Sequence, residues 1–292
     1  MTVHAVLQVI LSGVMMGLLY ALIAAGLSLI FGLMDVVNFA HGEFLMIAMY
    51  AMFVLVTLTG LDPLLLIPLV TALLFVFGCL VFAGVVRFAM RAKANLGMVQ
   101  VFATFGLGML LQGVAQLLFT PDYKSLAASW IGGKTISVFG LYLPLPQLVG
   151  AVISIAAFGA IWLIIARTDF GKALEATRED SGAVALVGID KNRIFTLGWG
   201  LGAALVGLAG SIMAIFFYIH PGVGAPFALI AFVTVALGGF GSIFGALAAG
   251  ILVGVVESVS ALVLSPSMKS IGVYAAYLAV VFIRPRGLFG SL

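Results

Sequence analysis

Four polar side chains interrupt the apolar N-terminal part of the sequence, in the stretch MDVVNFAHGE at residues 34–43. They are Asp35, Asn38, His41 and Glu43. Ionisable groups at a helix centre in a membrane cost roughly 2.5–3.5 kcal/mol, so they usually face a cavity or one another. If the stretch is helical, Asn38 and His41 share a face, and Gly42 allows the backbone to open toward a zwitterionic solute. The stretch is either part of a polar pathway or a short cytoplasmic turn with hydrated polar groups.

Two further polar residues lie near or within apolar runs. Glu257 is alone in the run 242–263, where it is a candidate for a pathway or for a hydrogen bond between helices. The alternative for Glu257 is a position near the membrane surface, at a helix end. His220 belongs to HPGVGAP, a turn rich in Gly and Pro, and we expect it to be structural.

The only long charged segment is RTDFGKALEATREDSGAVALVGIDKNR at 167–193. Its acidic and basic side chains lie three or four residues apart, a spacing at which they pair on a helix surface. Gly182 and Gly188 interrupt the pattern, which predicts one or two short helices in water. The segment is either a solvated loop between two spans or a docking element for a cytoplasmic partner.

The residues that covalent or metal chemistry would need are missing from the sequence. One histidine beside carboxylates is a poor metal site, and the single Cys79 excludes an internal disulfide or a cysteine-based metal cluster. Gly133, Lys134 and Thr135 resemble the end of a phosphate-binding loop, but the first glycine of that motif would fall at Ala128. We therefore expect no catalytic residues, metal or cofactor, and a membrane-embedded enzyme is disfavoured.

The composition indicates an all-α polytopic membrane protein. Hydrophobic residues make up 64% of the chain and charged residues 8%, against about 45–50% and 25% in soluble proteins. Residues 227–263 would form one helix of about 55 Å, too long for a core of about 30 Å, so we expect a break at Gly238, Gly239 and Gly241. The sequence predicts about eight to nine transmembrane helices, with broken or re-entrant segments. The candidate spans are 5–33, 44–61, 63–86, 96–119, 143–166, 194–219, 227–240, 242–263 and 270–284.

Glycine and alanine recur at intervals of four residues, as at Gly13 and Gly17 and at Ala246, Gly250 and Gly254. Small residues at this spacing allow helix backbones to approach closely in lipid. We expect most of these residues to hold the helices together.

The distribution of Lys and Arg predicts the orientation. Basic residues gather on the cytoplasmic side of membrane proteins. The N-terminus is then outside, 120–142 is the longest external loop, and 167–193 is cytoplasmic. The uncharged run 5–34 is about twice the length of a signal-peptide core and is expected to be a retained span. The three basic clusters are Arg87, Arg91 and Lys93; Arg167, Lys172, Arg178, Lys191 and Arg193; and Arg284 and Arg286.

Three blocks together give the chain a resemblance to a known family. They are GLLYALIAAGLSLIFGLMDVVNFAHGEF at 17–44, GKALEATREDSGAVALVGIDKNRI at 171–194, and ALGGFGSIFGALAAGILVGVVES at 236–258. The chain resembles the permease subunits of branched-chain amino-acid ABC importers, of the LivH type. The resemblance covers nearly the whole length and implies a single permease domain over 1–292.

The resemblance also implies partners and a location in the bacterial inner membrane. A second, related permease subunit would complete a heterodimer, two cytoplasmic ATP-binding subunits would hydrolyse ATP, and a periplasmic binding protein would deliver Leu, Ile or Val. Membrane lipid surrounds such a subunit, and nucleic acid has no role.

Two sets of residues match functional regions of that family. The residues expected to couple to the ATPase are Gly171, Glu175, Ala176, Arg178, Glu179, Asp180 and Gly188. Those expected along the substrate pathway are Asn38, His41, Gly42, Glu43 and Glu257.

Two other functions remain open. Related permeases carry urea, short amides or other amino acids, and specificity in such systems lies largely in the binding protein. A proton-coupled secondary transporter would instead relay protons through Glu43, His41 and Glu257 and would work without partners.

Overall fold

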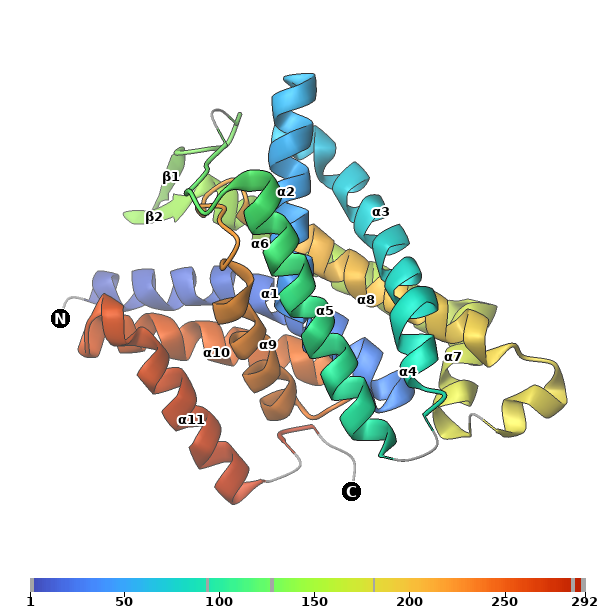
Figure 1. The fold of residues 1–292 in the computed structure, drawn as a ribbon. Coiled ribbons are helices and arrows are strands. Elements are labelled where there is room, and N and C mark those ends of the chain that lie inside the picture. Colours follow the sequence, from blue (N-terminus) through green and yellow to red (C-terminus); the bar gives the residue numbers. More distant parts are fainter. Residues whose placement is uncertain (1–2, 93–94, 127–128, 181, 285–286, 290–292) are drawn as a thin grey trace.

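The structure is a computed structural model that describes residues 3–92, 95–126, 129–180, 182–284 and 287–289. Almost all of it is helical (Figure 1). Within these residues eight helical stretches are long and apolar enough to cross a membrane. The expected all-α polytopic fold is therefore confirmed. The helices are α1 (Val3–Met34), α2 (His41–Thr59), α3 (Pro63–Val81), α4 (Arg87–Ala89), α5 (Leu96–Phe119), α6 (Leu145–Arg167), α7 (Asp169–Glu179), α8 (Lys191–Met213), α9 (Gly224–Gly238), α10 (Ile243–Val263) and α11 (Lys269–Ile283).

A short β hairpin and the charged helix α7 mark two ends of the molecule. Strands β1 (Thr135–Val138) and β2 (Leu141–Pro144) form an antiparallel hairpin within the expected external loop, with Thr135 opposite Pro144. This hairpin and α7 lie at opposite ends of the molecule (Figure 1). The arrangement agrees with one external and one cytoplasmic end.

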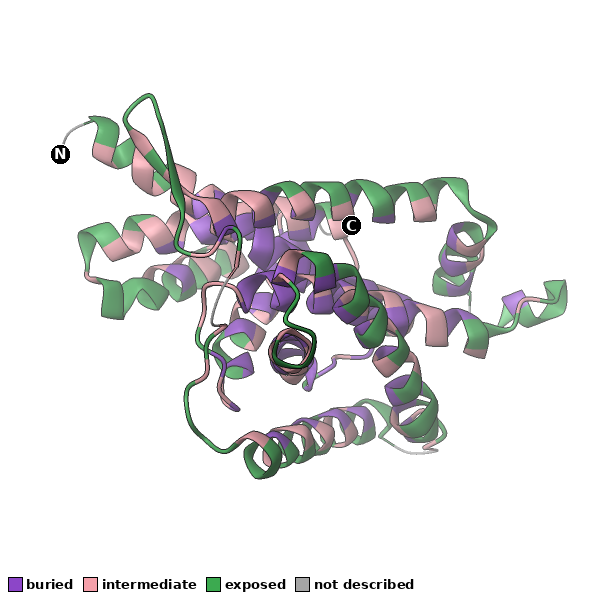
Figure 2. Ribbon diagram, turned by 90° about the horizontal axis from the view of Figure 1, so that it is seen from above, coloured by how far each residue is buried: buried purple, intermediate pink, exposed green. Residues whose placement is uncertain are grey.

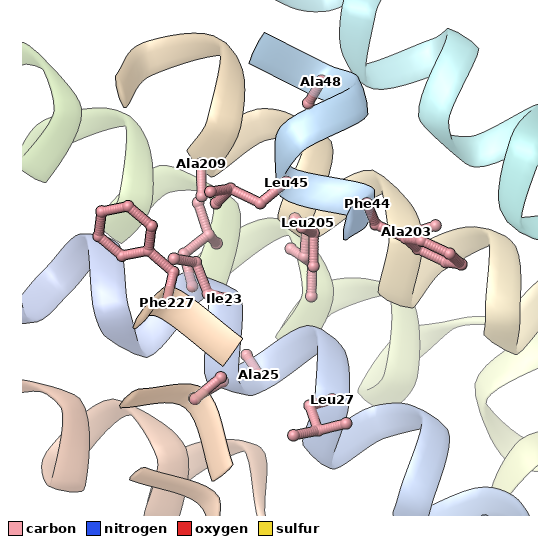
Figure 3. Close-up of a cluster of buried hydrophobic side chains, with 14 of the residues drawn as sticks. Ile23, Ala25, Leu27, Phe44, Leu45, Ala48, Ala203, Leu205, Ala209 and Phe227 are labelled. Carbon is pink, nitrogen blue, oxygen red and sulfur yellow. The ribbon is translucent and has the colours of Figure 1, made fainter. Parts of the chain in front are cut away.

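Helix α1 is the centre of the fold. It is apolar on all sides, which is typical of a helix that is buried on all sides. It packs against α6, α8, α9 and α10, and most of its side chains after Gly17 are buried. Figure 3 shows side chains of α1, α2, α8 and α9 meeting in this core, among them Ile23, Leu45, Leu205 and Phe227.

Small residues bring α1 and α10 into close contact, as expected from their spacing. A Cβ atom added at Gly13 would lie only 2.7 Å from the Cα of Val255. One turn later, a Cβ at Gly17 would lie 2.6 Å from the carbonyl oxygen of Gly250. Any larger side chain at either position would push the two helices apart.

The expected break after Gly238 is confirmed. Helix α9 ends there, Gly241 takes a φ of +78°, and the Ser242 hydroxyl accepts a hydrogen bond from the Gly245 N–H at 2.9 Å to start α10. The N–H of Leu288 donates to the carbonyl of Leu237 at 2.7 Å, so the C-terminal tail satisfies the end of α9. With 15 residues, α9 is about 22 Å long and does not cross a core of about 30 Å by itself.

Two expected spans differ in extent from the helices. The span 194–219 ends at Met213, and the chain then forms a loop in which Ile219 exchanges two backbone hydrogen bonds of 2.8 Å with Lys124. The span 63–86 continues to Ala89 through a π-helical turn at Phe82–Val86. Two of the basic residues that predict the orientation, Lys93 and Arg286, lie outside the described residues. The same holds for residues 127–128 of the expected external loop and for Ser181 of the charged segment.

Candidate functional site

The polar stretch near residue 40 lies deep in the helix bundle. The chain reverses after α1 and returns along it without helical structure before α2 begins at His41. The His41 Nε2 atom is 2.9 Å from the carbonyl oxygen of Ile23. Ile23 precedes the last residue of α1, Met34, by 34 − 23 = 11 residues, or about 16 Å of helix. Helix α2 therefore starts beside the middle of α1, and the connection between them is re-entrant.

Asn38 and His41 are completely buried at this connection. The Asn38 Oδ1 atom accepts a hydrogen bond from the Ala40 N–H at 3.1 Å. Within the described part of the chain, neither Asn38 Nδ2 nor His41 Nδ1 has a hydrogen-bond partner. A buried polar group without a partner costs about 1–3 kcal/mol. Because both residues are buried, the connection is not a turn whose polar groups are hydrated. Asn38 Nδ2 and His41 Nδ1 instead lie inside the protein without a partner among the described residues. Asn38 precedes α2, so it does not share a helical face with His41.

Helix α5 covers this connection with polar and small residues. The Thr104 hydroxyl accepts a hydrogen bond from the Phe39 N–H at 3.3 Å. One turn further, Gly108 faces Glu43, since a Cβ added there would lie 3.4 Å from Glu43 Oε2. The site residues predicted from the sequence include none of α5, although the chain repeats polar and small residues there at intervals of four, at Gln100, Thr104, Gly108 and Gln112.

This repeat forms a polar stripe along α5 that we call the α5 stripe, defined by Gln100, Thr104, Gly108 and Gln112. Gln100 and Thr104 are buried. At the far end, Gln112 approaches the loop of His220, because a Cβ added at Gly222 would lie 3.8 Å from Gln112 Nε2. The stripe therefore extends from the re-entrant connection to the loop that follows α8.

Gly42 brings α2 against α9. A Cβ atom added at Gly42 would collide with the carbonyl oxygen of Gly224, the first residue of α9. The starts of α2 and α9 are thus in backbone contact beside the polar connection.

Glu257 is not part of this cluster. Its side chain is 8% exposed, and its Oε1 atom lies 2.8 Å from Lys269 Nζ at the start of α11. The described residues give it no hydrogen bond or ion pair with residues 38–43. Of the two roles considered for Glu257, the structure supports the link between helices, here α10 and α11.

In the charged segment 167–193, α7 is the first helix. The Thr168 hydroxyl accepts a hydrogen bond from the Gly171 N–H at 3.1 Å and caps the helix. Gly171 also lets α7 fold back on α6, because a Cβ there would collide with the backbone carbonyl of Ile165. Leu174 and Thr177 are buried against the bundle, while the expected coupling residues Glu175, Ala176, Arg178 and Glu179 are exposed.

A short 3-10 helix, Ala183–Val187, follows α7 and projects from the molecule (Figure 2). The Asp180 carboxylate accepts hydrogen bonds from the N–H groups of Ala183 (2.9 Å) and Gly182 (2.8 Å), which hold its pKa below the usual value. Gly188, with a φ of +80°, ends the turn. Asp180 and Gly188, both expected coupling residues, therefore shape this projection.

The projection presents two apolar side chains to solvent, Leu186 at 89% and Val187 at 75% exposure. We call these two residues the apolar tip. They lie within the block that suggested docking, but they are not among the coupling residues predicted from the sequence. The signal for them is the apolar run GAVALVGI at 182–189, within an otherwise charged segment.

Arg178 connects α7 with the break between α9 and α10. A Cβ added at Gly241 would lie 2.9 Å from Arg178 Nη2. Contacts therefore run from Arg178 of α7 to Gly241, which follows α9, and from the start of α9 to Gly42.

Comparison with known proteins fits this arrangement. The family model described as the permease component of branched-chain amino acid transport systems matches residues 9–281. The chain belongs to this family. Among its relatives, the branched-chain amino acid permease BraD of Pseudomonas aeruginosa is 30% identical, covering 99% of this chain and 97% of the relative.

Other relatives extend the likeness. LivH of Escherichia coli is 30% identical over 97% of this chain and 95% of its own length. A probable LivH of Methanocaldococcus jannaschii is 28% identical over 82% and 76%. No solved structure matches the chain. The chain is therefore a multi-pass membrane permease that belongs to a transport system.

Proposed function

We propose that this chain is the LivH-type permease of an ATP-driven importer in the bacterial inner membrane, with branched-chain amino acids as cargo. The apolar tip carries the proposal. Two apolar side chains that are almost fully exposed on a capped 3-10 helix outside the membrane are typical of a protein contact site. The names of the relatives, permease proteins of branched-chain amino acid transport systems, support this cargo and a place among other subunits of a transport system.

The proposed assembly contains this chain, a second related permease, two cytoplasmic ATPase subunits and a periplasmic binding protein. Leu186 and Val187 insert into an apolar pocket of one ATPase subunit. The exposed charges of α7, among them Glu175 and Glu179, surround the contact and set its orientation.

The contacts of α9 suggest how ATPase closure reaches the pathway. A displacement of α7 moves Arg178, which lies against Gly241 at the cytoplasmic end of α9. At its other end, Gly224 is in backbone contact with Gly42. Because α9 is a short half-helix with glycine at both ends, it moves as a rigid rod between the two contacts.

The pathway itself follows the α5 stripe past Asn38, His41 and Glu43. The few polar groups of this pathway are separated by apolar side chains. Such a lining suits a zwitterion with an aliphatic side chain. An ion would need a continuous polar lining.

Co-purification with the candidate ATPase subunits tests the docking surface. We expect the double variant Leu186→Ser, Val187→Ser to insert into the membrane but to lose the ATPase subunits. The matched control is Ile136→Ser, Val138→Ser, which changes an exposed apolar pair in the external strand β1. Normal ATPase recovery with the first variant would refute docking through the apolar tip.

ATP hydrolysis by the reconstituted complex tests the cargo. We expect stimulation by binding protein loaded with leucine, isoleucine or valine, and none by empty binding protein. Stimulation only by loaded urea or amide would assign the other cargo. Uptake by this chain alone, driven by a proton gradient, would contradict the importer.

A further inference from the structure

A cavity of about 350 Å³ lies where the cytoplasmic segment meets the membrane helices. Its walls come from α1, α6, α7 and the chain between α9 and α10. Leu29 of α1, Phe158 and Ile161 of α6, and Leu174 of α7 make most of the interior apolar. Pockets of this size hold small molecules or parts of larger ones.

One edge of the cavity carries two opposite charges. Glu175 and Arg178 are three residues apart on α7, so they emerge on the same side of that helix. Among the described residues neither forms an ion pair. The cavity therefore offers one anionic and one cationic partner to a ligand that carries both charges.

A polar group also lines the cavity nearer the centre of the membrane. Ser28 is completely buried, and its hydroxyl has no hydrogen-bond partner within the described ranges. It precedes the end of α1 at Met34 by 34 − 28 = 6 residues, or about 9 Å of helix. A ligand that fits the cavity therefore carries charged groups for Glu175 and Arg178 and a further polar group, nearer the centre of the membrane, for the Ser28 hydroxyl.

The rim is apolar and exposed. Trp162 of α6 is 46% exposed and Phe244 of α10 is 61% exposed. Tryptophan is enriched where a membrane surface meets water. With α7 on the cytoplasmic side, this rim faces the acyl chains of the cytoplasmic leaflet just below the charged edge.

We propose that the cavity binds one phospholipid of the cytoplasmic leaflet, with a primary amine in its headgroup. The phosphate pairs with Arg178 and the ammonium with Glu175. The Ser28 hydroxyl donates to an ester carbonyl of the glycerol backbone, and an acyl chain leaves the cavity past Trp162 and Phe244. A free amino acid matches the two charges but leaves Ser28 without a partner.

Such a lipid contacts both the coupling helix and the α9–α10 break, through Arg178. Its presence therefore stiffens the connection on which the proposed transmission depends. The lipid site rests on the proposed function in one respect only, which is that α7 lies on the cytoplasmic side of the membrane.

Native mass spectrometry of the purified full-length chain, without ATPase, tests the site. The chain is offered equal amounts of phosphatidylethanolamine, phosphatidylcholine and phosphatidylglycerol. We expect one phosphatidylethanolamine to be retained per chain, ahead of the other two lipids. Equal retention of all three would refute a headgroup-selective site.

Three variants locate the binding. We expect Arg178→Gln to weaken retention of phosphatidylethanolamine roughly tenfold, in line with loss of a charge-assisted hydrogen bond. Glu175→Gln should remove the preference for phosphatidylethanolamine over phosphatidylglycerol. Ser28→Ala, a small change that leaves the packing intact, should weaken retention of all three lipids by a few fold.

The matched control is Lys172→Gln, which neutralises a cation on the same helix outside the cavity. If Arg178→Gln retains phosphatidylethanolamine as well as Lys172→Gln does, the lipid does not bind at this cavity. Retention of leucine in place of lipid would contradict the lipid site and assign the cavity to a free amino acid. Loss of the lipid when the second permease is added would also contradict it and assign the rim of the cavity to that subunit. Because ATPase is absent, failure here is distinct from failure of docking.

Discussion

Buried polar residues have two different environments in this permease. Asn38 and His41 keep polar atoms without protein partners at the re-entrant connection. Glu257, equally conspicuous in the sequence, is paired with Lys269. Unpartnered buried groups are costly unless a ligand uses them, whereas a buried ion pair is compatible with a purely structural role.

The pair of Glu257 and Lys269 gives an unequal response to mutation. Lys269→Met leaves the buried carboxylate without its cation and should lower the free energy of unfolding by about 1–3 kcal/mol. Glu257→Gln leaves a half-exposed lysine that reaches water, so its cost should be smaller, about 0–1 kcal/mol. Thermal unfolding in detergent measures both variants.

The double variant Glu257→Gln, Lys269→Met is the control for a structural role. It should recover much of the lost stability and transport normally. Loss of transport in a stable double variant would return Glu257 to the pathway.

Among the elements, α9 joins the cytoplasmic segment to the polar connection. It has a backbone contact at one end, between Gly42 and Gly224, and at the other end the Arg178 side chain lies against Gly241. We expect a short helix held in this way to transmit displacement to α2, because Gly42 and Gly224 have no side chains that could deform.

Gly42→Ala tests this contact. The added methyl group overlaps the Gly224 carbonyl, and such overpacking costs about 1–3 kcal/mol. We expect ATPase subunits still to co-purify, because the apolar tip is unchanged, while leucine uptake falls strongly. Uptake in membrane vesicles and co-purification are the two measurements.

Gly106→Ala on α5 is the matched control, because a Cβ at that position meets no atom within 4 Å. Its uptake should equal that of the unmodified chain. Normal uptake with Gly42→Ala would remove the α2–α9 contact from the mechanism.

For the whole molecule, we expect the charged segment and the β hairpin to lie on opposite sides of the membrane. In a Cys79→Ser background, we expect Glu179→Cys to react with a membrane-impermeant maleimide only when the cytoplasmic side is exposed. Lys134→Cys, beside the hairpin, should react from the outside. Labelling of both from one side would overturn the orientation drawn from Lys and Arg.

The sequence predicts much of this architecture because membrane burial imposes strong patterns. Length and apolarity predict the spans, and consecutive glycines predict the break between α9 and α10. The depth of His41 could not be predicted, because it depends on α2 packing beside the middle of α1. The α5 stripe was visible as a spacing, but only packing shows that it faces residues 38–43 and not lipid. Likewise, the partner of Glu257 lies on a helix whose position no local pattern gives.

The apolar tip also matters before assembly. A permease made in excess of its ATPase leaves Leu186 and Val187 in contact with water. Chaperones and proteases continuously remove chains that expose such surface. If the proposed docking holds, we expect newly made permease that finds no ATPase to be short-lived, so that the supply of ATPase limits how many permeases accumulate. The same two side chains would then keep the subunits of the proposed importer in matched numbers.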